Sequence, residues 1–220
     1  MNSELQKRTF TSIVLIFLLT LMYLYSFIMI TALIVIAIII WVEFYALISK
    51  IIKKNKFKDK FLRFFYKAIS LLYLSLIVFL IFTIESFYPN QKIYLLYVIL
   101  VAILSDIGGL IIGKTFKGKK LTKISPNKTI SGSVGSFLFS IILIPFFYKN
   151  LIEFNFLIMF IITLTISFIS QAGDLFISYM KRKAKVKDTS DMLPGHGGFL
   201  DRVDGIIFAI PIGLILFNFF

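Results

Sequence analysis

The stretch "TSIVLIFLLTLMYLYSFIMITALIVIAIIIWVEF", residues 11–44, decides the fold class. It carries no charge before Glu43 and exceeds the roughly 20 apolar residues that cross the hydrocarbon core of a bilayer. Bilayers admit only helices or closed β-barrels, because every backbone polar group must be hydrogen-bonded within the protein. Barrel strands would alternate over short segments, whereas this run is continuous. The sequence therefore predicts an all-α, polytopic membrane protein.

The composition of the whole chain agrees with this prediction. Of 220 residues, 59% are hydrophobic and only 16% are charged, against about 25% charged residues in soluble domains. The absence of cysteine excludes disulfides and thiolate metal sites. The net charge of +13 could indicate a nucleic-acid partner, but lysine and arginine also collect in the cytoplasmic loops of membrane proteins. We therefore expect no nucleic-acid partner.

Seven apolar segments are expected to form helices. They lie at residues 11–25, 27–48, 65–84, 93–112, 132–148, 155–178 and 204–220. The first two are separated only by a weak break at residues 25–27. One straight helix over these about 38 residues would measure roughly 57 Å, about twice the hydrocarbon thickness. Two spans are favoured, and a single span stays open as the alternative.

The distribution of basic residues predicts the orientation. With seven spans and a cytoplasmic N-terminus, every lysine and arginine except Lys92 and Lys149 falls on the cytoplasmic side. The positive-inside rule therefore favours seven helices, with the C-terminus outside, in the cytoplasmic (inner) membrane. We expect one membrane domain over residues 1–220. Residues 1–100 are expected to form the N-terminal helices, and residues 101–220 the half that carries the charged motifs.

Acidic residues within or beside apolar spans are costly and often mark functional sites. Five are candidates: Glu43, Asp106, Asp174, Asp201 and Asp204. Asp201 and Asp204 are three residues apart, which predicts one shared face in the first turn of the last helix. Glu43 stands beside aromatic residues and is interpreted as an interfacial residue, so it carries little weight as a site candidate.

The segment "KRKAKVKDTSDMLPGHGGFLDRVDG", residues 181–205, combines basic residues, acids, the only histidine and several glycines. Carboxylates without cysteine suit a hard cation such as Mg²⁺, which proteins hold with one or two carboxylates plus substrate phosphates. The basic residues suit a polyphosphate. Together they indicate phosphoryl or nucleotidyl transfer at the membrane surface. The simpler alternatives are a basic loop that faces anionic lipids and acids that stabilise a helix N-terminus.

Residues 178–204, "SYMKRKAKVKDTSDMLPGHGGFLDRVD", resemble the signature of phosphatidate cytidylyltransferases. Two further stretches are similar to this family, "SDIGGLIIGKTFKGKKLTKISPNKTISG" at 105–132 and "SQAGDLFIS" at 170–178. Residues 1–100 match in hydropathy only. Ser131 stands where the family usually has glutamate.

The resemblance implies an enzyme that makes CDP-diacylglycerol and pyrophosphate from CTP and phosphatidic acid with Mg²⁺. It also implies a second cation, K⁺, and a homodimer. Asp174 and Asp201 would bind the metal, and Asp204 would support them. Further catalytic candidates are Lys181, Arg182, Lys187, Arg202 and His196, of which His196 has no assigned role. Expected substrate-binding residues are Asp106, Lys114, Ser125, Lys128, Thr129, Asp188, Gly195, Gly197 and Gly198.

Two kinds of alternative stay open. Another enzyme that uses CTP on a lipid, such as a polyprenol kinase or an archaeol-type cytidylyltransferase, would carry similar groups; the kinase would transfer the γ-phosphate and release CDP. An ion-coupled transporter would use Asp106 and Asp174 to bind a cation, but transporters typically show inverted repeats, and none is visible.

Overall fold

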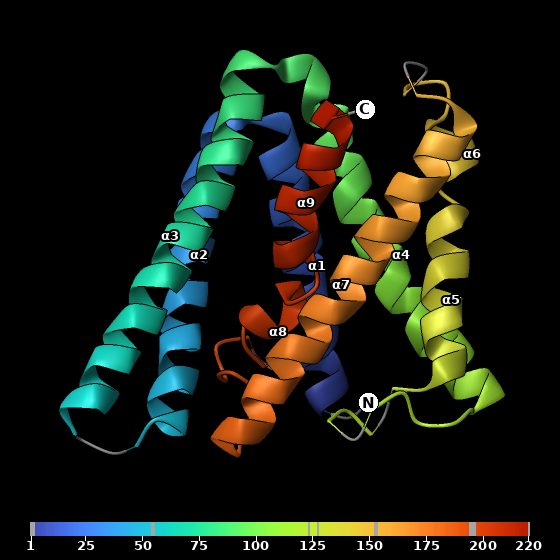
Figure 1. Ribbon diagram of the computed structural model, residues 1–220. Helices are drawn as coiled ribbons and strands as arrows, with labels where there is room; N and C mark the ends of the chain where they lie inside the picture. Colours follow the sequence, from blue (N-terminus) through green and yellow to red (C-terminus); the bar gives the residue numbers. More distant parts are fainter. Residues whose placement is uncertain are drawn as a thin grey trace. The chain divides into compact units, whose positions relative to one another are not determined.

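The computed structural model describes residues 3–53, 56–122, 124–126, 128–151, 154–193 and 197–219. Within these ranges the chain is helical and has no strand, only two isolated bridges, Lys120 with Thr129 and Leu193 with Gly197 (Figure 1). The helices are α1 Ser3–Leu24, α2 Ser26–Ile51, α3 Phe57–Phe87, η1 Pro89–Gln91, α4 Lys92–Phe116, α5 Ile130–Ile141, α6 Ile144–Phe147, α7 Phe156–Ala184, α8 Leu200–Val203 and α9 Ile206–Phe219. The all-α prediction is confirmed.

The chain divides into two compact units. The first contains Met1–Glu85 and Met180–Val203, and the second contains Ser86–Tyr179 and Asp204–Phe220. Helices α1, α2, α3 and α8 belong to the first unit, whereas α4, α5, α6 and α9 belong to the second. Helix α7 runs through the second unit and ends in the first. The prediction of one membrane domain stays a prediction.

The weak break between the first two apolar segments is a real helix boundary. Tyr25 adopts an extended conformation, with φ −126° and ψ 108°, between the end of α1 and the start of α2. The two helices then pack against each other. A single long helix over residues 11–48 is thereby excluded, as the length argument predicted.

Five helical segments in the described part of the chain have the length and apolar composition to cross a membrane. They are Ser26–Ile51, Phe57–Phe87, Pro89–Phe116, Ile130–Phe147 and Phe156–Ala184. This is the pattern of a multi-pass membrane protein. Two of the seven expected segments, 11–25, most of which lies in α1, and 204–220, most of which forms α9, are not among these five. The segment 132–148 is broken after Ile141 into α5 and α6.

Helices α4 and α5 of the second unit approach closely through glycines. A Cβ added to Gly108 would lie 2.5 Å from the Gly135 carbonyl oxygen, and one added to Gly135 would lie 2.7 Å from that of Gly108. Small residues allow such backbone contact between membrane helices. Gly108, two residues after Asp106, therefore has a packing role in this structure.

We expect Gly135→Ala to destabilise the second unit. The new methyl group would meet Ile112 Cγ1 at 2.6 Å as well as the Gly108 carbonyl, and such overpacking costs about 1–3 kcal/mol. Thermal unfolding of the detergent-solubilised protein measures the loss. Val134→Ala, on the exposed side of the same helix, is the control. Equal midpoints for the two variants would contradict the packing account.

Hydroxyl pairs join α4 to α7 inside the second unit. The Tyr97 and Thr163 hydroxyls lie 2.6 Å apart, and those of Ser105 and Ser167 lie 3.0 Å apart. All four residues are buried. Such hydrogen bonds hold membrane helices together where lipid gives no hydrophobic driving force. They fix the part of α7 that precedes Asp174.

Candidate active site

The segment after α7 begins with a helix cap formed by a lysine. Lys185 has φ 58°, the left-handed conformation that commonly follows a helix end. Its N–H donates to the Arg182 carbonyl at 3.1 Å, and the Val186 N–H donates to the Lys181 carbonyl at 3.0 Å. These two bonds form a Schellman motif, which ends α7 and directs the chain into residues 186–199.

Two backbone hydrogen bonds join Leu193 to Gly197, shortly before α8. The Leu193 N–H donates to the Gly197 carbonyl at 2.8 Å, and the Gly197 N–H donates to the Leu193 carbonyl at 3.2 Å. Gly197 has φ 81°, which favours glycine, and a Cβ there would lie 3.1 Å from Asp201 Oδ2. Two predicted site residues between Leu193 and Gly197, Gly195 and His196, lie outside the described residues.

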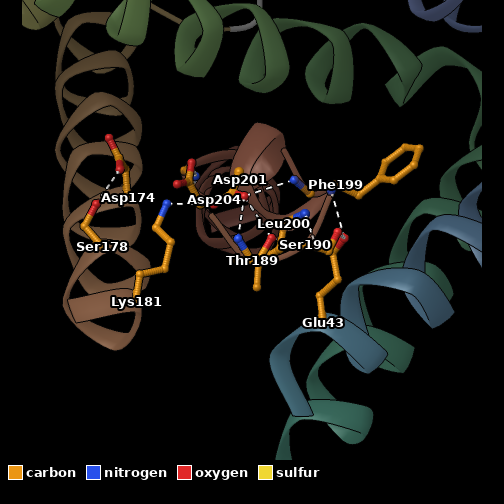
Figure 2. Close-up of polar contacts among 12 residues, drawn as sticks. Glu43, Asp174, Ser178, Lys181, Thr189, Ser190, Phe199, Leu200, Asp201 and Asp204 are labelled. Carbon is orange, nitrogen blue, oxygen red and sulfur yellow. Dashed lines mark hydrogen bonds and ion pairs between the residues drawn. The ribbon is translucent and has the colours of Figure 1, made fainter. Parts of the chain in front are cut away.

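Asp201, at the start of α8, is the most strongly held of the predicted site residues in the first unit. Its Oδ1 accepts from Lys181 Nζ at 2.7 Å. Its Oδ2 accepts from the Thr189 N–H at 2.8 Å and the Gly198 N–H at 3.0 Å, and lies 2.9 Å from the Thr189 hydroxyl (Figure 2). Burial raises the pKa of Asp201, but the bonds from Lys181, Thr189 and Gly198 outweigh it and hold that pKa below its ordinary value. The carboxylate is therefore kept charged.

Glu43 stood among the acidic candidates, but the sequence did not indicate its role. It lies on α2, its exposed fraction is 4%, and it accepts hydrogen bonds on both carboxylate oxygens. Oε1 accepts from the Ser190 hydroxyl at 2.6 Å and the Phe199 N–H at 3.1 Å. Oε2 accepts from the Thr189 hydroxyl at 2.9 Å and the Leu200 N–H at 2.8 Å. The only signal in the sequence was a lone charge in a long apolar run.

The second unit brings together two of the stretches that carried the family resemblance. Lys128, from "SPNKT", forms an ion pair with Asp174 on α7. The Ser178 hydroxyl, one turn further along the helix, donates to Asp174 Oδ1 at 3.3 Å. Nearby, the Ser133 hydroxyl donates to the Gln171 side-chain oxygen at 2.6 Å. Two predicted residues, Lys128 and Asp174, are therefore in direct contact.

Two other predicted binding residues have structural contacts. Thr129 is the N-cap of α5, and its hydroxyl accepts from the Gly132 N–H at 3.0 Å. Ser131, which replaces the family's glutamate, places its hydroxyl 3.0 Å from that of Thr129. Ser125 accepts the Lys128 N–H at 3.1 Å through its carbonyl. These contacts shape the turn that presents Lys128.

The expectation that Asp201 and Asp204 lie together in the first turn of the last helix is wrong. Asp201 belongs to α8, whereas Asp204 lies in the turn before α9. The Asp204 carboxylate accepts the Gly205 N–H at 3.0 Å, a local bond of the kind that competes with a continuing helix. Gly205 in turn packs against Ser170, whose carbonyl oxygen would lie 3.0 Å from a Cβ there.

The remaining predicted residues have exposed side chains within their own units. They are Asp106, Lys114, Arg182, Lys187, Asp188 and Arg202. Exposure leaves the cationic members accessible to a charged substrate, and Lys181 to Lys183 occupy the last turn of α7. Basic residues are favourable there, because the helix dipole places partial negative charge at its C-terminus.

The donor set fits a hard cation. Asp201 and Asp174 each have a lysine ammonium at the carboxylate, Lys181 and Lys128 respectively, so each carboxylate already binds a positive charge. The described residues contain no group of three or more histidine, cysteine, aspartate or glutamate side chains that could hold a metal. Mg²⁺ usually binds one or two carboxylates and takes its other ligands from water and substrate phosphates.

Comparison with known proteins gives a consistent result. The phosphatidate cytidylyltransferase of Rickettsia typhi is 42% identical over 147 residues, which cover 63% of this chain and 62% of that protein. Its counterpart in Rickettsia bellii is 41% identical over 155 residues, 67% of each chain. The one from Staphylococcus saprophyticus is 42% identical over 126 residues, 56% of this chain and 48% of the relative. The match to the Rickettsia typhi protein thus spans less than two thirds of its length. The cytidylyltransferase family matches the chain over residues 1–220, and the chain belongs to this family.

Proposed function

We propose that this protein is a phosphatidate cytidylyltransferase, which converts CTP and phosphatidic acid into CDP-diacylglycerol and pyrophosphate. The family and the names of the relatives support this activity. The observation that carries it is Asp201, a charged and nearly buried carboxylate whose oxygens are fixed by Lys181, Thr189 and Gly198. A carboxylate held in this way suits the binding of a cation that accompanies a polyphosphate.

The location of this site supports a lipid substrate. Phosphatidic acid keeps its acyl chains in the bilayer and its phosphate at the surface, whereas CTP stays in water. A site for both must lie where a membrane helix ends. Helix α7 is long and apolar enough to cross a membrane, and its last turn supplies Lys181 and Arg182. The segment that contains Asp201 follows directly.

In the proposed reaction an oxygen of the lipid phosphate attacks the α-phosphorus of CTP. The bond from that phosphorus to the bridging oxygen breaks, and pyrophosphate leaves. A phosphate monoester is largely ionised at pH 7, so no strong general base is needed. The main barrier is repulsion between two anions, which cationic side chains reduce by binding and aligning the phosphates.

Individual residues are proposed to share this work. Asp174 and Asp201 would hold Mg²⁺, which when bound neutralises phosphate charge. Lys181, which pairs with Asp201, would contact a phosphate oxygen of the substrate. Arg182 and Lys187 would contact phosphates in the same manner. For Asp204 we propose a supporting role, through its hydrogen bond with the chain that begins α9.

The finer features of the protein also belong to this proposal. Seven spans with a cytoplasmic N-terminus and an external C-terminus follow from the distribution of lysine and arginine. That orientation puts residues 113–131 and 179–203 on the cytoplasmic side of the inner membrane, where CTP is available. A K⁺ beside Mg²⁺ and a homodimer are proposed from the family resemblance.

Pyrophosphate release tests the proposal. The detergent-purified protein is expected to release pyrophosphate only when CTP and phosphatidic acid are both present. EDTA should stop the release and added Mg²⁺ should restore it. Diacylglycerol, which lacks the attacking phosphate, is the control substrate. A folded protein that releases no pyrophosphate, or releases it equally with diacylglycerol, would overturn the proposed function.

A further inference from the structure

Glu43 and Asp201 are connected through one residue. The Thr189 hydroxyl lies 2.9 Å from Glu43 Oε2 and 2.9 Å from Asp201 Oδ2. A hydroxyl has one proton and donates to one of these carboxylates at a time. The Thr189 N–H also donates to Asp201. Displacement of Thr189 would therefore disturb Asp201 directly.

Glu43 contacts two stretches of chain that both precede Asp201. In the first stretch Glu43 holds the side chains of Thr189 and Ser190, and in the second it holds the backbone N–H groups of Phe199 and Leu200. Leu200 precedes Asp201 and is 2% exposed. Glu43 thus holds to α2 two stretches, residues 189–190 and 199–200, that both border the Asp201 carboxylate (Figure 2).

Burial makes these contacts strong. Glu43 is 4% exposed, and a buried carboxylate is stable only when hydrogen bonds replace the water it has lost. Bonds to a charged acceptor are about twice as strong as those between neutral groups. The groups that face Glu43 are all donors, so a side chain with fewer acceptors would leave some of them unsatisfied.

We propose that Glu43 is a positioning residue. It holds residues 189–190 and 199–200 so that the Asp201 carboxylate keeps the orientation needed to bind the cation and its phosphates. The catalytic consequence rests on the proposed function, whereas the hold on these residues does not. Groups that orient a metal ligand in this way typically contribute about 10- to 100-fold to metal affinity or activity.

Hydrogen exchange in the absence of metal and substrate tests the hold itself. The Phe199 and Leu200 amides donate to Glu43, whereas the Thr189 and Gly198 amides donate to Asp201. In Glu43→Ala the Phe199 and Leu200 amides should exchange faster because their acceptor is gone. The Thr189 and Gly198 amides should also exchange faster, because Thr189 loses its bond to Glu43. Glu43→Gln should give a smaller effect, because one oxygen remains an acceptor.

Glu85→Gln is the matched control. Glu85 lies on α3 of the same unit and accepts from the Ser26 hydroxyl at 2.5 Å. This variant therefore makes the same chemical change as Glu43→Gln at another helix position of the first unit, one that is part-buried. Exchange of residues 189–201 should equal that of the unsubstituted protein. Unchanged exchange at all four amides in folded Glu43→Ala would overturn the inference.

Kinetics test the effect on Asp201. We expect the Mg²⁺ concentration for half-maximal rate to rise about 10- to 100-fold in Glu43→Ala, with no change in Glu85→Gln. A purely structural role would lower the yield of folded protein and leave this concentration unchanged, which would overturn the positioning role. If the unsubstituted protein makes no CDP-diacylglycerol, the proposed function fails, and faster exchange in Glu43→Ala would still support the hold on residues 189–201.

Discussion

Asp201→Asn is expected to lower the rate of CDP-diacylglycerol formation about 10²- to 10³-fold, the range found when one preorganised electrostatic group is removed from a reaction site. The substitution keeps the size of the side chain and removes its charge. If the asparagine oxygen keeps the bonds from the Thr189 and Gly198 N–H groups, the asparagine NH₂ group faces Lys181 Nζ, where the aspartate accepts a hydrogen bond at 2.7 Å. Two donors would confront each other, and the carboxylate proposed to bind the cation would be lost.

The rate should be measured together with folding. Asp191→Asn is a matched control, because Asp191 is an exposed acid in the same segment and its replacement makes the same change of charge. Both variants should elute as folded protein in detergent, and only Asp201→Asn should lose activity. Near-normal activity of folded Asp201→Asn would show that the assignment of Asp201 to the cation is wrong.

Gly198→Ala is expected to lower the rate of CDP-diacylglycerol formation nearly as much as Asp201→Asn, for a steric reason. A Cβ at this position would lie 2.6 and 2.8 Å from the two Glu43 carboxylate oxygens and closer still to the Thr189 hydroxyl. Thr189 is 5% exposed and bonded on both sides, so it cannot move away without breaking a bond. Misplacement of a reacting group by about 1 Å can cost about 10²-fold in rate.

A double variant tests this explanation. Thr189→Ala removes the hydroxyl that is closest to the new methyl group. The double variant should therefore lose less transition-state stabilisation, calculated from the rates, than the sum of the losses in the two single variants. Residues in contact commonly show such coupling, by about 0.5–3 kcal/mol. Strictly additive losses, or full activity of Gly198→Ala, would contradict the steric account.

The parts of the fold that depend on local sequence could be predicted. Apolar runs longer than a bilayer core predicted helices, and the limit on helix length predicted the boundary at Tyr25. Asp201 could be singled out because an acid next to apolar residues and glycines is unusual. The shared face with Asp204 could not be judged correctly, since the turn at Asp204 depends on a side-chain bond to Gly205 and on packing against Ser170.

The role of Glu43 depends on distant parts of the chain. Its partners Thr189 and Leu200 are 146 and 157 residues away, and no periodicity connects them. Aromatic neighbours made an interfacial position the natural interpretation. The contact of Lys128 with Asp174 is similar, because it requires α5 and α7 to be placed first. Residue types were visible in the sequence, whereas their pairing required the fold.

The position of the transferred phosphorus tests the central claim most directly. The same preparation is given phosphatidic acid, Mg²⁺ and CTP labelled either at the α- or at the γ-phosphate, and the lipid fraction is counted. Cytidylyl transfer predicts label in the lipid from α-labelled CTP only, with an equal amount of pyrophosphate released. Lipid label from γ-labelled CTP, with release of CDP, would contradict the account and identify a CTP-dependent lipid kinase.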